Sequence, residues 1–165
     1  MIGERDGQVT PRLQNLHDVF KQANLKPVIS SDILGWLAIH YVEFLGVIGG
    51  ILKAGSFDAF VDRSELIKES ILATRESLAI CKARGIDFKQ AAPANIRIID
   101  STPVFLLTPL VKMQYRTPSI KQFFEENLQH GMEEIACQYT DVLKEGKRLG
   151  VKTPFLTGFE KYFVS

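Results

Sequence analysis

The stretch GWLAIHYVEFLGVIGG, residues 35–50, is almost wholly apolar but contains one histidine and one glutamate. Glu43 follows His40 by three positions, so in a helix the two side chains share a face and lie within hydrogen-bond reach. A histidine and a carboxylate held together in this way can move a proton or bind a small anion. Alternatively, the two groups only satisfy each other inside a buried helix. The spacing alone favours this second interpretation.

An aromatic and aliphatic face accompanies this pair. Trp36, His40, Phe44 and Ile48 follow one another at i, i+4, i+8 and i+12, which places them along one side of a helix. Such a wall beside the histidine could enclose a small ligand, although the same spacing is also typical of a core helix.

A second pair of carboxylates lies near the other end of the chain. Glu133 and Glu134 follow Gly131, which we expect to separate two helices. The two glutamates would then lie in the first turn of the second helix, where carboxylates complement the helix dipole. Their spacing therefore indicates a structural role before a chemical one.

Common enzyme motifs are missing from the sequence. It contains no G-x-G-x-x-G, no G-x-x-x-x-G-K-[ST], no H-E-x-x-H and no G-x-S-x-G. Cys81 and Cys137 are far apart, and neither belongs to a Cys-x-x-Cys pair. This pattern predicts free thiols in a reducing compartment, with neither a disulfide nor a zinc site.

The composition is that of an ordinary globular domain. The chain has 165 residues with 20 basic and 19 acidic side chains, so no charge excess favours nucleic acid or an anionic membrane as a partner. The opening MIGERDGQV is charged where a signal peptide needs an apolar run, so we expect a cytoplasmic protein. Residues 33–52 approach the length of a membrane span. Since Glu43 and His40 would then lie near the bilayer centre, we expect a buried core helix instead.

Helix signals dominate the elements that must position these residues. A threonine followed by proline predicts a helix over residues 11–24, and a serine–aspartate pair predicts a longer one over 32–54. This longer helix is apolar almost all round, so we expect it to form the buried centre. The fold class predicted is all-α, a single bundle of six to eight helices around residues 32–54.

Glycines interrupt the predicted central helix. Gly35, Gly46, Gly49 and Gly50 all fall inside it, and each costs about 0.5–1 kcal/mol relative to alanine. This concentration indicates that another helix, or a ligand, approaches the backbone closely. Close helix packing is the simpler of the two interpretations.

Four segments together resemble one protein family. They are IGERDGQVTPRLQNLHDVF, SSDILGWLAIHYVEFLGVIGGILKAGSF, ATRESLAICKARGID and HGMEEIACQYTDVLKEGKRLGVKTPFL. The chain resembles the C-terminal helical domain of ketopantoate reductases (2-dehydropantoate 2-reductases), a fold like the C-terminal domain of 6-phosphogluconate dehydrogenase. The resemblance implies that residues 1–9 are a remnant of the last Rossmann strand and its linker. It implies that residues 10–165 form the helical domain.

The resemblance also implies an activity and its catalytic residues. In the family, a Rossmann domain binds NADPH, and the cleft beside the helical domain reduces ketopantoate to D-pantoate in pantothenate biosynthesis. His40 falls where the family has its general-acid lysine. Glu134 falls at the catalytic carboxylate, with Glu133 as the neighbouring alternative.

Substrate-binding positions follow from the same resemblance. Phe44 and Ile48 fall where the family has two asparagines, and Gln122 falls where it has a serine. Glu43, beside His40, is the fourth residue that we expect at the substrate. Two of these four positions thus carry apolar side chains where the family has amides.

Two hypotheses for the function follow. The first is the substrate-binding and dimerisation half of an NADPH-dependent 2-ketoacid reductase, inactive as an isolated chain. Its expected partners are a small carboxylate, a Rossmann domain in cis or in trans, and a second copy of the chain. The second is a non-enzymatic module for oligomerisation or for binding a small acid. The Phe-rich segment PFLTGFEKYF and the glycine-rich central helix offer apolar surface for self-association.

Overall fold

The computed structural model describes residues 1–163, and in this part of the chain the only regular elements are helices. The predicted all-α class is therefore confirmed. Short helices and a break in the central helix raise their number above the six to eight expected. In chain order they are α1 (Pro11–Gln22), α2 (Ile33–Val42), α3 (Leu45–Ala54), α4 (Phe57–Asp62), α5 (Ser64–Ala83), α6 (Phe88–Ala91), α7 (Ala94–Ser101), α8 (Val104–Tyr115), α9 (Pro118–Arg148) and α10 (Pro154–Phe163).

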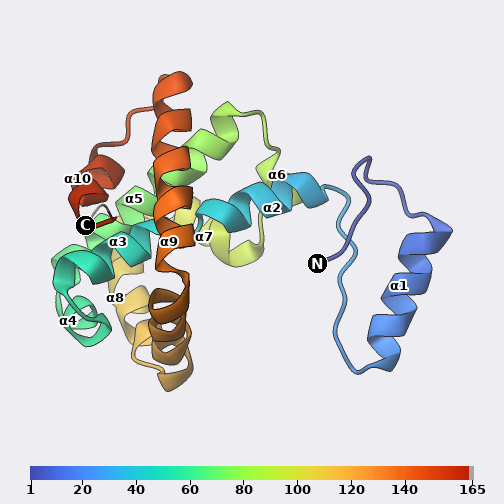
Figure 1. Ribbon diagram of the computed structural model, residues 1–165, viewed down its shortest axis with the longest axis horizontal. Helices are drawn as coiled ribbons and strands as arrows, with labels where there is room; N and C mark the ends of the chain where they lie inside the picture. Colours follow the sequence, from blue (N-terminus) through green and yellow to red (C-terminus); the bar gives the residue numbers. More distant parts are fainter. Residues whose placement is uncertain (164–165) are drawn as a thin grey trace.

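The predicted central helix consists of α2 and α3 placed end to end (Figure 1). The break lies at Glu43 and Phe44, whose backbones stay in the right-handed helical region. The Glu43 N–H still donates to the Ile39 carbonyl at 3.0 Å, and the Ile48 N–H donates to the Phe44 carbonyl at 2.9 Å. Because a helical backbone continues through the break, side chains of the two helices keep a common face.

Neighbouring parts of the same chain occupy the space beside the glycines of α3. A Cβ at Gly46 would lie 2.4 Å from a backbone oxygen of α5. A Cβ at Gly49 would lie 2.5 Å from the ring of Phe159, and one at Gly50 would lie 2.6 Å from the ring of Phe60. The close-packing interpretation is therefore correct for these three positions.

One stretch of residues 1–163, Ile33–Ala54, is long and apolar enough to cross a membrane by length and composition. Half of its most apolar window is buried inside the helical body.

Gly131 does not end a helix, which corrects the boundary expected there. α9 runs from Pro118 to Arg148 without interruption. A glycine inside a helix costs about 1 kcal/mol relative to alanine. Burial of Phe124 on one side of Gly131 and of Ile135 and Tyr139 on the other outweighs that cost. As a result, Glu133 and Glu134 lie in the middle of a helix, and the helix-dipole interpretation does not apply to them.

The Phe-rich C-terminal segment is not free apolar surface, which corrects one basis for expecting self-association. α10 buries Leu156, Phe159 and Phe163 to 5% exposure or less. Phe159 lies against Gly49 of α3, and Phe163 stacks on Tyr139 of α9 with ring centroids 3.8 Å apart. Both features that suggested a homodimer are thus used for packing within the chain.

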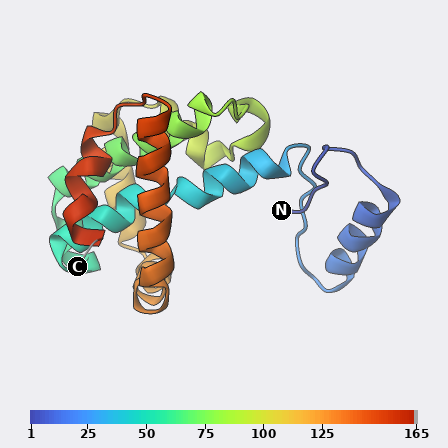
Figure 2. The ribbon, with the colours of Figure 1, turned by 45° about the horizontal axis from the view of Figure 1, so that its top comes forward.

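Residues 1–31 lie to one side of the helical body (Figure 1, Figure 2). Ile2 and Ile29 form a parallel β-bridge, in which the Ile2 N–H donates to the Val28 carbonyl at 3.0 Å. Since α1 connects the two paired segments, this part of the chain follows an extended–helix–extended order. Several apolar side chains of this segment are exposed: Val9, Leu16, Val19, Leu25 and Val28.

The two cysteines differ in their access to solvent, and this difference predicts their reactivity. Both thiols are free, with Cys137 exposed and Cys81 buried at 2% exposure. Burial raises the pKa of the Cys81 thiol to about 11, so at pH 8 it holds almost no reactive thiolate. A thiol-specific disulfide reagent should therefore titrate one thiol of the native protein quickly, and the second only in denaturant. Cys137→Ser should remove the fast phase; two fast thiols in the native wild type would contradict this assignment.

Candidate functional site

A cavity of about 430 Å³ lies between the α2–α3 pair and the middle of α9. His40 and Phe44 contribute to its wall from α2 and the break, Ile48 from α3, and Glu134 from α9. We call it the His40 cavity. Its volume falls in the range of small-molecule sites, about 300–1,000 Å³. The structure thus brings together four residues that the sequence resemblance placed at one site.

Local helix geometry explains why His40, Phe44 and Ile48 share this wall. They are spaced by one helical turn each, and the backbone remains helical through the break between α2 and α3. Ile48 is 5% exposed and is the most buried of the three. Trp36, one turn before His40, lies outside the wall and stacks on the imidazole with ring centroids 4.8 Å apart.

His40 is held in place by Glu43. Its Nδ1 lies 2.5 Å from Glu43 Oε1, while the side chains are 52% and 10% exposed, respectively. Burial raises the pKa of the Glu43 carboxyl above its ordinary value, and the hydrogen bond from His40 offsets part of that rise. With Nδ1 bound to the carboxylate, the second ring nitrogen, Nε2, is the one that remains for a ligand.

The opposite wall comes from one face of α9. Asn127, Gly131, Glu134 and Gln138 line the cavity at spacings of four, three and four residues. The Gln138 amide donates to Glu134 Oε1 at 3.4 Å. Sequence reasoning missed Asn127 and Gln138 because it ended a helix at Gly131. Reading α9 as one continuous helix would have revealed this polar stripe by its period.

Tyr41 is a further residue of this cavity that the sequence analysis missed. It lies one position after His40 on α2 and lines the same space. Burial raises the pKa of the Tyr41 phenol, and the negative charges of Asp141 and Glu134 raise it further. At neutral pH the phenol is thus protonated and can donate a hydrogen bond into the cavity.

Three expected residues lie outside the wall of the His40 cavity. Gln122 is exposed and its amide donates to Glu126 at 2.7 Å, so the structure does not bring it to the site. Glu133 is exposed beside Glu134 but is not part of the wall. Glu43 is connected to the His40 cavity only by its hydrogen bond to His40, and its own side chain lines a second cavity. Within residues 1–163, no group of three or more metal-binding side chains is found.

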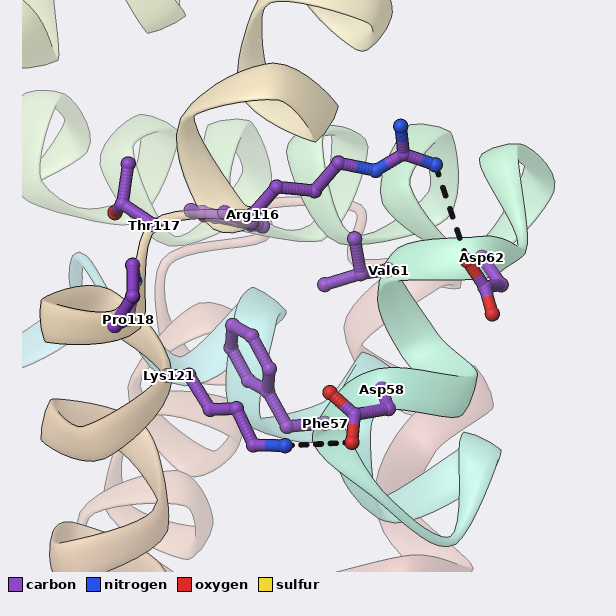
Figure 3. Close-up of a pocket in the computed structure, with 9 residues that line it drawn as sticks. Phe57, Asp58, Val61, Asp62, Arg116, Thr117, Pro118 and Lys121 are labelled. Atoms are coloured by element: carbon purple, nitrogen blue, oxygen red, sulfur yellow. Dashed lines mark hydrogen bonds and ion pairs between the residues drawn. The ribbon is translucent and has the colours of Figure 1, made fainter.

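A separate hollow, between α4 and the turn from α8 to α9, has a structural explanation (Figure 3). Lys121 pairs with Asp58 at 2.6 Å, and Arg116 lies 4.0 Å from Asp62. Each of these four charges faces one of the opposite sign. The two charge pairs link α4 to the turn before α9 and to the first turns of α9.

Comparisons with protein-family models, with curated proteins and with solved structures find no significant match to this chain.

Proposed function

We propose that this chain is the substrate-binding helical domain of an NADPH-dependent 2-ketoacid reductase of the ketopantoate reductase type. The observation that carries the proposal is the His40 cavity. His40 and Glu134, the residues aligned with the general acid and the catalytic carboxylate, come from helices far apart in the sequence and line one ligand-sized space. A purely structural role would not require these two polar residues to face the same cavity.

His40 and Glu134 can each take a defined part in ketone reduction. Reduction adds a hydride to the carbonyl carbon and a proton to its oxygen. Glu43 fixes the imidazole through Nδ1, so Nε2 of the protonated ring can deliver that proton to the ketone oxygen. Glu134, on the opposite wall, can accept a hydrogen bond from a substrate hydroxyl. The two functional groups would thereby hold the substrate from both sides.

The apolar wall narrows the class of substrate. Phe44 and Ile48 cannot form the hydrogen bonds that the family's asparagines provide. Polar recognition is left to His40, Glu134 and neighbouring groups such as Asn127. This arrangement favours a 2-ketoacid with a branched or otherwise apolar side chain, which packs against Phe44 and Ile48.

The dinucleotide itself does not fit the residues present. The sequence has no G-x-G-x-x-G loop, the motif that approaches the pyrophosphate of NADPH. We expect a Rossmann domain, in cis or in trans, to bind the cofactor that supplies the hydride. The extended–helix–extended order of residues 1–31, with its exposed apolar side chains, supports docking of such a domain there. The chain alone should not oxidise NADPH.

Binding of a 2-ketoacid by the chain tests the proposal directly. Isothermal titration with ketopantoate should show saturable binding by the wild type. His40→Ala and Glu134→Gln should each weaken it roughly tenfold or more, because the first removes a hydrogen-bonding group and the second removes the charge that strengthens a hydrogen bond. His130→Ala, an exposed position on α9 outside the cavity, is the matched control and should leave the affinity unchanged.

Two results would reject the proposal. One is equal ketopantoate affinity in the wild type, His40→Ala and Glu134→Gln. The other is rapid NADPH oxidation by this chain alone with ketopantoate, because the Rossmann domain would then not be required.

The apolar residues Phe44 and Ile48 favour a second candidate, a module that binds a small acid without turnover. Retained binding with no NADPH oxidation, even when a cofactor-binding domain is joined to the chain, would support that module.

A further inference from the structure

A second cavity, of about 420 Å³, lies on the other side of Phe44. It is enclosed by α3, α5, α7, α8 and α9, and Glu43 lies at its wall, so we call it the Glu43 cavity. Phe44, Phe123 and Phe124 line both this cavity and the His40 cavity. The two spaces are therefore neighbours separated by a layer of aromatic rings.

The walls of the Glu43 cavity are mostly aliphatic. Val47, Ile71, Leu107 and Val111 provide buried apolar surface, each at 8% exposure or less. Leu110 lies at the wall but is 56% exposed, which marks the side open to solvent. A linear hydrocarbon chain could enter past Leu110 and exchange water contact for contact with these side chains.

Residues with polar groups interrupt this apolar wall: Glu43, Thr74, Asn95, Gln114 and Tyr115. The Glu43 side chain is 10% exposed, and its Oε1 is bound to His40 while its Oε2 has no hydrogen-bond partner in the described residues. Thr74 is 3% exposed, and its Oγ1 lies against Gly46 of α3, 2.6 Å from where a Cβ of that residue would be.

The charge of the lining residues determines which kind of head group the Glu43 cavity would bind. Glu43 is the charged residue of the wall, and no lysine, arginine or histidine among the described residues lines it. An anionic head group would meet the Glu43 carboxylate, which has the same sign and of which only Oε1 is bound to His40. A cationic head group would gain an ion pair with Oε2 and compensate the burial of that carboxylate.

We propose that the Glu43 cavity binds a linear alkylammonium ion, whose ammonium pairs with Glu43 Oε2 and whose chain packs against the aliphatic wall. This site is distinct from the 2-ketoacid site proposed for the His40 cavity, and it does not depend on that activity.

Titration calorimetry with three eight-carbon probes of different charge tests this proposal. Octylammonium should bind more tightly than 1-octanol, and octanoate should bind most weakly. Lengthening the amine from six to eight carbons should tighten binding about three- to fourfold per methylene, as expected for apolar burial. Glu43→Gln should weaken octylammonium roughly tenfold and leave 1-octanol nearly unchanged.

A surface substitution provides a second test that does not risk the core. Leu110→Lys places a positive charge at the mouth and should weaken octylammonium while tightening octanoate. Phe105→Lys is the matched control, because Phe105 lies on the same helix, is 75% exposed and is not part of this wall. Trp36 is the single tryptophan and stacks on His40. Its fluorescence emission should therefore change when the ammonium of octylammonium pairs with Glu43.

Three outcomes would overturn the proposal. They are the absence of saturable binding by octylammonium, an octanoate affinity equal to that of octylammonium, and equal effects of Leu110→Lys and Phe105→Lys. Ketopantoate titrations of the Leu110→Lys variant separate the two sites. They should match the wild type if the His40 cavity binds the ketoacid independently.

Discussion

Gly46→Ala is expected to lower the free energy of unfolding by about 3 kcal/mol, at the upper end of overpacking effects. The added methyl group would lie 2.4 Å from the Ser70 carbonyl oxygen and 2.7 Å from the Thr74 amide nitrogen. Both atoms belong to the backbone of α5, so no side-chain rotation can relieve the collision. α3 and α5 would have to move apart, which would loosen the centre of the fold. Chemical denaturation followed by circular dichroism measures the loss.

Gly158→Ala is the matched control for that prediction. Gly158 lies inside α10, and a Cβ there would meet no other heavy atom within 4 Å. Alanine should therefore stabilise the protein by about 0.5–1 kcal/mol through helix propensity. If both substitutions changed stability equally and in the same direction, close approach at Gly46 would not be the reason for its glycine.

Glu76→Ala is expected to cost about 2 kcal/mol, because two hydrogen bonds to a charged acceptor are lost together. The Glu76 carboxylate, on α5, accepts from the backbone N–H of Leu156 at 2.8 Å and of Phe155 at 3.1 Å. It thereby caps the first turn of α10 from a distant part of the chain. Burial raises the pKa of the Glu76 carboxyl, and these two backbone hydrogen bonds counteract the rise. Amide hydrogen exchange should accelerate over residues 154–163 in the variant.

Glu69→Ala supplies the comparison on the same helix. Glu69 pairs with Lys53 at 2.6 Å, and both side chains are one-third exposed. A partly exposed ion pair contributes within about 1 kcal/mol, so this variant should unfold close to the wild type. Exchange over residues 154–163 should stay as in the wild type. A Glu76→Ala effect no larger than that of Glu69→Ala would show that α10 does not depend on this cap.

The sequence was sufficient to predict the wall that contains His40, because the period of a helix is a local property. His40, Phe44 and Ile48 share a face for the same reason that their spacing suggested it. The opposite wall could not be predicted in the same way. Gly131 favoured a helix end by propensity, and only burial of side chains on both sides of it keeps α9 continuous. The stripe that includes Asn127 and Gln138 was hidden by that error.

Features that depend on contacts between distant residues could also not be predicted from the sequence. Nothing near Glu76 in the chain indicates that it caps α10, because its partners lie on another helix. The same holds for Phe159, which seemed available for self-association and instead fills the space left by Gly49. Helix class and faces follow from local patterns, whereas caps and cavities follow from how helices pack.

The layer of rings between the two cavities links whatever they bind. Phe44 lies 5.4 Å from Phe123 and 5.8 Å from Phe124, and the last two rings lie 5.2 Å apart, measured between centroids. Because all three rings line both cavities, a ring displaced by the occupant of one cavity would also change the wall of the other. Thermodynamic linkage then requires reciprocity: the factor by which one occupant changes the affinity of the second equals the factor in the reverse direction.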